Sequence, residues 1–223
     1  MIKSELRKIC DIAKVVLIAV ILQRLVEFFF AYMLYTMSHN NAGMDIKTLG
    51  ECAILAETVI FVVVLSLIYN KNFSFWTNPF ELFKENKAKC FNDIIAILLA
   101  VMIINNITSI LLPESAFVDY SGTEEILINK KSWISFMSVV IAGPIYEEIA
   151  YRGCIFSVIK KYYGSYAGIL ISSALWAMMH PSLLQKVNTF FLGLVCAWYY
   201  NKNENLWIVV LPHIFNNLIA FYL

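Results

Sequence analysis

Apolar residues along the chain gather into seven stretches that polar breaks separate. Scanned with a window of about 19 residues, which suits membrane-spanning helices, the stretches lie at roughly 12–35, 51–69, 93–112, 132–158, 166–180, 186–200 and 206–222. The breaks include SHNNAGMD, the acidic PESAFVDYSGTEE and NKNEN. A helix needs about 20 apolar residues to cross a hydrocarbon core of about 30 Å. The pattern therefore predicts an all-α fold, a polytopic transmembrane helical bundle of about six to seven spans.

One polar break has a pattern of its own. Residues 73–90 read FSFWTNPFELFKENKAKC, in which Phe, Trp and Leu precede a run of lysines. This order is typical of a helix lying at the membrane interface. An ordinary polar loop explains the stretch equally well, so both interpretations stay open.

The composition favours a membrane protein. Of the 223 residues, 60% are hydrophobic and 15% are charged, and the mean hydropathy is +0.70. A soluble domain is nearer half apolar and a quarter charged. The net charge of +1 gives no reason to expect a nucleic-acid partner. The five cysteines are scattered without a CxxC or His–Cys spacing, which argues against a disulfide framework or a thiolate metal site.

The placement of lysine and arginine indicates orientation, because cytoplasmic loops are enriched in positive charge. Of the 17 such residues, eleven fall on the side of the membrane that holds the N-terminus and four on the opposite side. Arg24 and Arg152 lie within spans. We therefore expect a multi-pass integral membrane protein whose N-terminus is cytoplasmic. The frequent Asn, Lys and Ile residues favour a bacterium with an AT-rich genome, and hence the bacterial cell membrane.

The stretch PIYEEIAYRG places Glu147, Glu148 and Arg152 inside an apolar span. A charge at the bilayer centre costs roughly 2.5–3.5 kcal/mol on insertion scales, so these groups need partners or a polar cavity. Glu148 and Arg152 are four residues apart and share a helix face, in the favourable acid-before-base order. Glu147 points about 100° away from Glu148. We expect Arg152 to hold Glu148 and Glu147 to stay available for chemistry.

Gly143 and Pro144 come directly before these acids. Proline lacks an N–H and clashes with the preceding turn, so the carbonyl of Val140 is expected to lose its helical partner. A kink or widened turn here would open the backbone, which a membrane helix tolerates only beside protein or a wet cavity. A simple kinked helix explains the proline equally well.

Two later spans carry polar pairs at helical spacing. ALWAMMH places Trp176 four residues before His180, and LPHIFNN places His213 four residues before Asn217. Taken singly, a buried histidine is more often a hydrogen-bonded packing residue, and an asparagine often only joins two helices. A convergence of Glu147, both histidines and the asparagine from three helices is harder to explain by packing alone.

Three motifs of the chain together resemble those of the CPBP family of intramembrane proteases. They are EExxxR, an aromatic residue followed by xxxH, and HxxxN. That family includes the CAAX-processing enzyme Rce1 and bacterial members tied to bacteriocin processing and self-immunity. The resemblance covers the C-terminal part of the chain. It implies a CPBP-like catalytic core at 132–223 and N-terminal transmembrane helices and loops at 1–131, both within a single bundle. Trp176 stands where the family usually has Phe, so it keeps the aromatic wall of a substrate pocket, which its larger indole would narrow.

The resemblance implies a role for each matched residue. Glu147 would be the base that activates a water, with His180 beside it. His213 and Asn217 would hold that water or the developing oxyanion. Glu148 and Arg152 would brace the site. The full implied set of catalytic residues is Glu147, Glu148, Arg152, His180, His213 and Asn217.

Whether a metal takes part stays open. Glu147, His180 and His213 together offer the ligands of a Zn²⁺ site with water in an open position. Yet the chain has no HExxH motif, asparagine is an uncommon zinc ligand, and members of the family have been described both as metalloproteases and as metal-free, glutamate-dependent proteases. No cofactor is firmly implied, although a divalent metal such as zinc is compatible with these residues.

Three functions are compatible with the sequence. The first is an intramembrane endopeptidase that acts near the cytoplasmic face on a bacteriocin-like peptide, a prenylated or lipidated chain end, or another membrane protein. The second is a non-catalytic bacteriocin-immunity or toxin-binding membrane protein. The third is a small transporter that uses buried carboxylates as a proton relay, although no pair of broken helices supports it. The expected partners are a peptide or membrane-protein substrate and the lipid bilayer, and the oligomeric state stays open.

Overall fold

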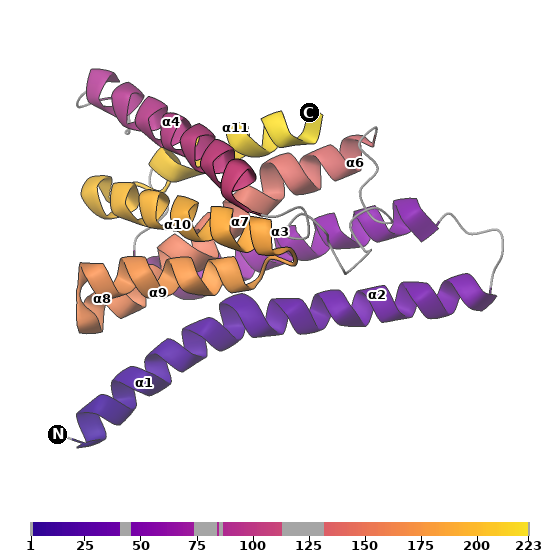
Figure 1. Cartoon of the computed structure of the whole chain (residues 1–223). Helices are drawn as coiled ribbons and strands as arrows, with labels where there is room; N and C mark the ends of the chain where they lie inside the picture. The colour runs from indigo at the N-terminus through magenta and orange to yellow at the C-terminus, as the bar shows by residue number, and fades with distance from the viewer. Residues whose placement is uncertain (1, 41–45, 74–83, 85–86, 113–131, 223) are drawn as a thin grey trace.

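The computed structural model describes residues 2–40, 46–73, 84, 87–112 and 132–222, and within these ranges seven helical segments form the fold (Figure 1). The first segment joins α1 (Ile2–Val16), η1 (Leu17–Leu22) and α2 (Gln23–Asn40), and the next two are α3 (Ile46–Phe73) and α4 (Lys87–Leu111). The fourth is a composite helix made of α6 (Trp133–Phe136), η4 (Met137–Ala142), α7 (Gly143–Glu148), η5 (Ile149–Phe156) and α8 (Ser157–Tyr163). The last three are α9 (Ser165–Met178), α10 (Leu183–Asn203) and α11 (Trp207–Tyr222). The η segments are π-helical turns. The predicted all-α fold is confirmed.

Within the described ranges, three helices are long and apolar enough to cross a membrane, namely Thr48–Tyr69, Lys87–Leu111 and Trp133–Tyr163. α9 and α11 are apolar but shorter. All five overlap predicted spans, and the two other predicted spans fall on the α1–α2 helix and on α10. A helical membrane bundle is thus confirmed, whereas the count of six to seven spans stays a prediction. The predicted interfacial helix at 73–90 lies for the most part outside the described residues.

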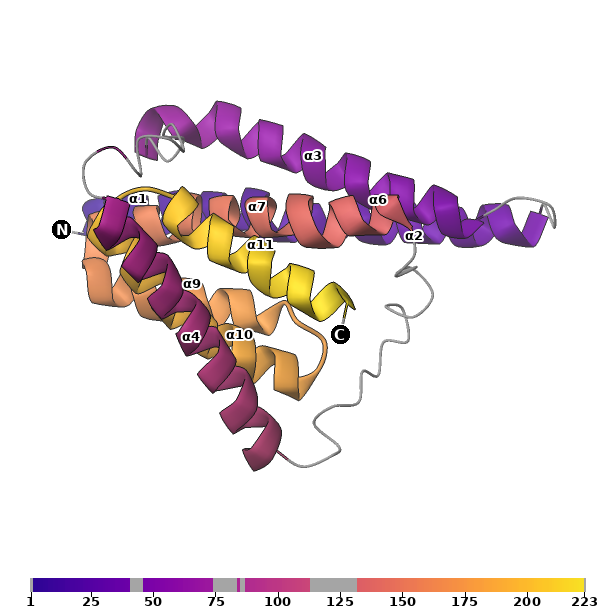
Figure 2. The same cartoon turned by 90° about the horizontal axis from the view of Figure 1, so that it is seen from above.

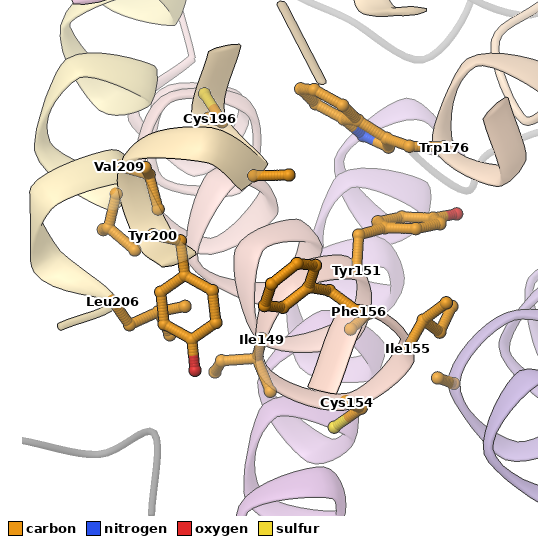
Figure 3. Packing of buried hydrophobic residues seen from close by; sticks show 14 of the residues in the cluster. Ile149, Tyr151, Cys154, Ile155, Phe156, Trp176, Cys196, Tyr200, Leu206 and Val209 are labelled. Carbon is orange, nitrogen blue, oxygen red and sulfur yellow. The ribbon is translucent and has the colours of Figure 1, made fainter. Parts of the chain in front are cut away.

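The composite helix from α6 to α8 lies at the centre of the bundle. Figure 2 shows it between α3 and α11, and α9 packs against its η5 turn. All eight residues of η5 are buried, and Ile149, Cys154 and Ile155 belong to the hydrophobic core shown in Figure 3. Because neighbours surround this helix, any charge on it has to find its partner inside the bundle.

α10 runs back along α9 at close range (Figure 1). A Cβ placed on Gly193 would lie 2.8 Å from the Cβ of Ser173, so the two helices meet at small residues, as is common in membrane bundles. The turn between them ends in a capping box in which Ser182 and Gln185 bond each other's backbone N–H. The predicted break around His180 therefore separates two helices.

Candidate active site

The site begins at a π-helical turn just before the acidic pair. The N–H of Gly143 donates to the carbonyl of Ser138, five residues back. The carbonyl five residues before Pro144 belongs to Val139, and proline has no N–H to give it. The widened turn predicted before Glu147 is therefore present.

Asn217 of α11 supplies the missing donor. Its Nδ2 donates to the carbonyl oxygen of Val139 at 3.0 Å. The sequence argument expected the carbonyl of Val140 to lose its partner, because it assumed α-helical spacing. In the π register the carbonyl opposite the proline nitrogen is that of Val139, and the amide of Asn217 satisfies it. A buried carbonyl needs such a partner, since leaving it unpaired is costly.

Glu148 and Arg152 form a buried ion pair, as their spacing predicted. Nη1 of Arg152 lies 3.2 Å from Oε1 of Glu148, and the two side chains are 1% and 0% exposed. Within the described residues, none of the three guanidinium nitrogens has the geometry of a hydrogen bond to a partner. Charge attraction, rather than hydrogen bonding, therefore joins the two groups. The guanidinium also lies 4.0 Å from the ring centroid of Trp176, within the range of a cation–π interaction.

His213 lies between the two acids. Its Nδ1 is 3.0 Å from Oε1 of Glu148, and its Nε2 is 3.7 Å from Oε2 of Glu147. A carboxylate oxygen can only accept a hydrogen bond, so Nδ1–H is the donor to Glu148. This bond fixes the ring and turns Nε2 toward Glu147. The buried pair thus holds the imidazole that faces the second acid.

Glu147 is the accessible acid of the pair. Its side chain is 28% exposed, whereas its neighbour Glu148 is fully buried. Nε1–H of Trp176 donates to Oε2 of Glu147 at 2.8 Å. Oε1 has no hydrogen-bond partner among the described residues. The predicted division between a held acid and an available one agrees with this geometry.

His180 reaches the site only through Trp176. Its Nδ1 lies 3.1 Å from the carbonyl oxygen of Trp176, and the two rings make an edge contact with centroids 5.8 Å apart. No direct bond joins His180 to Glu147 or His213 in the described part of the chain. The structure therefore gathers Glu147, Trp176 and His213 closely, with His180 at the edge and Asn217 turned toward the backbone of η4.

Tyr151 belongs to the same cluster and was missed from the sequence. Its ring centroid lies 6.1 Å from that of Trp176, and its phenol is within electrostatic reach of Glu147 and of Arg24 from the first helix. The available signal was its spacing, four residues after Glu147 on the same helix. In the sequence, a tyrosine in an apolar span cannot be distinguished from an ordinary packing residue, so Tyr151 was not selected as a site residue.

The three residues named as ligands in case a metal is present do not all contact one another in the described structure. Glu147 and His213 face each other, but His180 meets the indole of Trp176 instead. Across the ranges that the structure describes, no group of three or more His, Cys, Asp or Glu side chains is arranged to hold a metal ion. We therefore derive no step through a metal from this arrangement.

Comparison with known proteins adds a family to this geometry. Residues 129–219 match the family described as "Type II CAAX prenyl endopeptidase Rce1-like". Over this segment the chain is similar to the CPBP/CAAX protease family. The resemblance carried by the three motifs is thus confirmed, and all the matched site residues lie inside the CAAX protease-like segment.

A curated relative extends the comparison of the CAAX protease-like segment. The "Putative membrane peptidase YdiL" of Bacillus subtilis (strain 168) is 29% identical over 77 residues, which are 34% of this chain and 32% of the relative. The match therefore spans about a third of that protein's length. No solved structure matches the chain.

Proposed function

We propose that the chain is an intramembrane endopeptidase that hydrolyses a peptide bond near the cytoplasmic face, with Glu147 activating the attacking water. The CAAX protease-like segment supports a peptidase. The observation that carries the proposal is the asymmetry of the acid pair: Glu148 is buried beside Arg152, while Glu147 is partly exposed and faces Nε2 of His213. A carboxylate that its neighbours hold by one oxygen, and that is still partly exposed, is suited to general base catalysis when a water reaches it.

The reaction follows from these positions. Glu147 takes a proton from a water as the water oxygen bonds to the peptide carbonyl carbon, and the carbonyl oxygen becomes an oxyanion. His213, whose Nδ1–H is given to Glu148, holds the water by accepting its second O–H at Nε2. Asn217 supplies the donor for the oxyanion, because it keeps one N–H beyond the one given to Val139. The C–N bond then breaks, and the proton on Glu147 passes to the leaving amine.

The same geometry suggests how the brace acts. Glu148 and Arg152 do not reach solvent, so they act on the reaction only through their neighbours. Glu148 fixes the ring of His213 through Nδ1, and Arg152 stacks on Trp176. Each of the two therefore holds a side chain that in turn contacts Glu147.

The substrate we propose is a peptide segment presented within the membrane. Prenylated or lipidated chain ends, bacteriocin-like peptides and the tails of membrane proteins all meet this requirement. The CAAX prenyl endopeptidase description of the matching family favours a chain end near the bilayer surface. The choice of the cytoplasmic face for cleavage depends on the expected orientation of the chain.

The test is cleavage of membrane-embedded reporter peptides by purified protein in proteoliposomes. Glu147→Ala should lower the rate roughly 10²–10⁴-fold, the usual contribution of a general base, while the protein stays folded by circular dichroism. Glu204→Gln, a change at a largely exposed side chain, is the matched control and should keep full activity. Cleavage retained in Glu147→Ala would remove the proposed base. If Glu147→Ala and His213→Ala still protected cells from a bacteriocin that the wild type resists, the non-catalytic immunity function would replace it.

A further inference from the structure

Trp176 sits where the groups of the site meet. It is 2% exposed, and its indole contacts five side chains of the cluster. The N–H bonds Glu147, one face receives the guanidinium of Arg152, and the ring makes edge contacts with His180 and His213. Figure 3 shows it beside Tyr151, whose ring centroid is 6.1 Å away.

The indole N–H makes the two oxygens of Glu147 unequal. An indole nitrogen can only donate, and it donates to Oε2 at 2.8 Å. The same oxygen faces Nε2 of His213 at 3.7 Å. Oε1 has no such contact in the described chain, so the carboxylate is held by one oxygen and open at the other. Rotation of the carboxylate about its last bond would break the bond to Trp176.

The indole itself is held in turn. Arg152 lies 4.0 Å from its ring centroid, and Arg152 is fixed by its ion pair with Glu148. A guanidinium that stacks on a buried aromatic face restrains the ring at little entropic cost, because both groups are planar and already desolvated. The buried pair thus supports the carboxylate of Glu147 through Trp176.

We propose that Trp176 is a positioning residue that fixes the Glu147 carboxylate by Oε2, so that Oε1 is the atom that takes the proton from the attacking water. This inference rests on the proposed function. In the step, the water O–H bond breaks and its proton bonds to Oε1, while the water oxygen forms a bond to the carbonyl carbon, whose π electrons move to the carbonyl oxygen. Phenylalanine at this position would fill similar space but has no N–H to hold the acid.

Trp176→Phe is the first variant that tests this role. Loss of one hydrogen bond to a charged group should lower kcat roughly 10- to 100-fold, and KM should change little because the N–H that phenylalanine lacks is given to Glu147. Trp198→Phe, at an exposed position on α10, is the matched control and should leave kcat unchanged. Replacing Trp176 by benzothienylalanine, which has the same shape with sulfur in place of N–H, should reproduce the loss in kcat. Full activity of that isostere would overturn the proposal.

A spectroscopic measurement tests the contact without any turnover. The ultraviolet resonance Raman difference between wild type and Trp176→Phe isolates the hydrogen-bond-sensitive indole band of Trp176. In Glu147→Ala this band should move to the position of an indole without a hydrogen bond. An unchanged band would show that the contact does not exist, and would also overturn the proposal.

The two readouts separate this inference from the proposed function. If Glu147→Ala still cleaved peptides, the proposed base would fail whatever the Raman band did. If the wild type cleaved and Glu147→Ala did not, while Trp176→Phe kept the wild-type kcat, the proposed function would stand and only the positioning role of Trp176 would fail.

Discussion

Glu148 and Arg152 show how charges persist inside an apolar helix. Each would be expensive alone in the membrane, and the removal of water from an ion pair offsets much of its attraction. Here the remaining contacts come from His213, which donates to Glu148, and from Trp176, whose face lies against Arg152. The pair is therefore a support for the site rather than an independent source of stability.

Removing one member of this pair should be more harmful than removing both. Arg152→Met keeps a long side chain but leaves Glu148 buried without its opposite charge, so the free energy of unfolding should fall by about 3–5 kcal/mol. Denaturant unfolding in detergent micelles measures it. The double variant Glu148→Gln with Arg152→Met should lose less than Arg152→Met alone. Lys160→Met breaks a surface pair with Glu204 and should cost only about 0–1 kcal/mol; an equally small loss in Arg152→Met would contradict the prediction.

At this scale the sequence predicts pairs within one helix better than contacts between helices. The Glu148–Arg152 pair follows from a spacing of four residues, whatever the rest of the fold does. The place of His213 between the acids depends on how α11 approaches α7, which no local pattern contains. From the sequence, the aromatic ring of Trp176 suggested the wall of a substrate pocket. The direction of its N–H, which donates to Glu147, depends on the position of α9 and could not be predicted.

The helices of the site are joined through their π-helical turns. Such a turn leaves backbone carbonyls without the usual partner, and side chains from other helices take their place. The hydroxyl of Tyr146 on α7 donates to the carbonyl of Ala19 in η1, and Asn217 on α11 donates to that of Val139 in η4. The first and last helices are thereby fixed to the helix that carries both acids.

Helix positions were predictable and helix register was not. Hydropathy located all seven helical segments of the described ranges, because crossing a bilayer demands length and apolarity alone. Proline at 144 predicted a disturbed turn. The choice of a π register, which moves the free carbonyl from Val140 to Val139, depends on the donor that Asn217 brings from α11, and this is a tertiary contact.

The contact between α9 and α10 should be sensitive to a single methyl group. Gly193→Ala would place a Cβ 2.8 Å from that of Ser173, so the helices must separate, and such overpacking typically costs about 1–3 kcal/mol. Thermal or denaturant unfolding in micelles measures the loss. Ser173→Gly removes the opposing atoms and should restore part of the stability of Gly193→Ala, although it is destabilising by itself. A double variant no more stable than the sum of the two single effects would contradict this close packing.

At the scale of the whole molecule, two ion pairs of the described residues that lie outside the buried site are found at the same end of the bundle. Lys160 of α8 pairs with Glu204 at 3.3 Å, and Lys202 of α10 pairs with Asp93 of α4 at 3.1 Å. α1 packs against α8 at the same end (Figure 1). These are segments that the charge pattern assigned to a single side of the membrane, and the fold places them together. Which side this end faces is still a prediction from the positive-inside rule.

The N-terminal end should face the cytoplasm, and Cys10 can report it. Cys10 on α1 is exposed and lies before the first predicted span, so a membrane-impermeant maleimide should label it in inside-out vesicles and not in intact cells. Cys52 is also exposed, but it lies within the span Thr48–Tyr69, where lipid hinders formation of the reactive thiolate. Three further cysteines are buried and should stay unlabelled. Cys10→Ser should therefore abolish the signal from inside-out vesicles. Labelling of Cys10 in intact cells would reverse the orientation and move the proposed cleavage to the opposite face of the membrane.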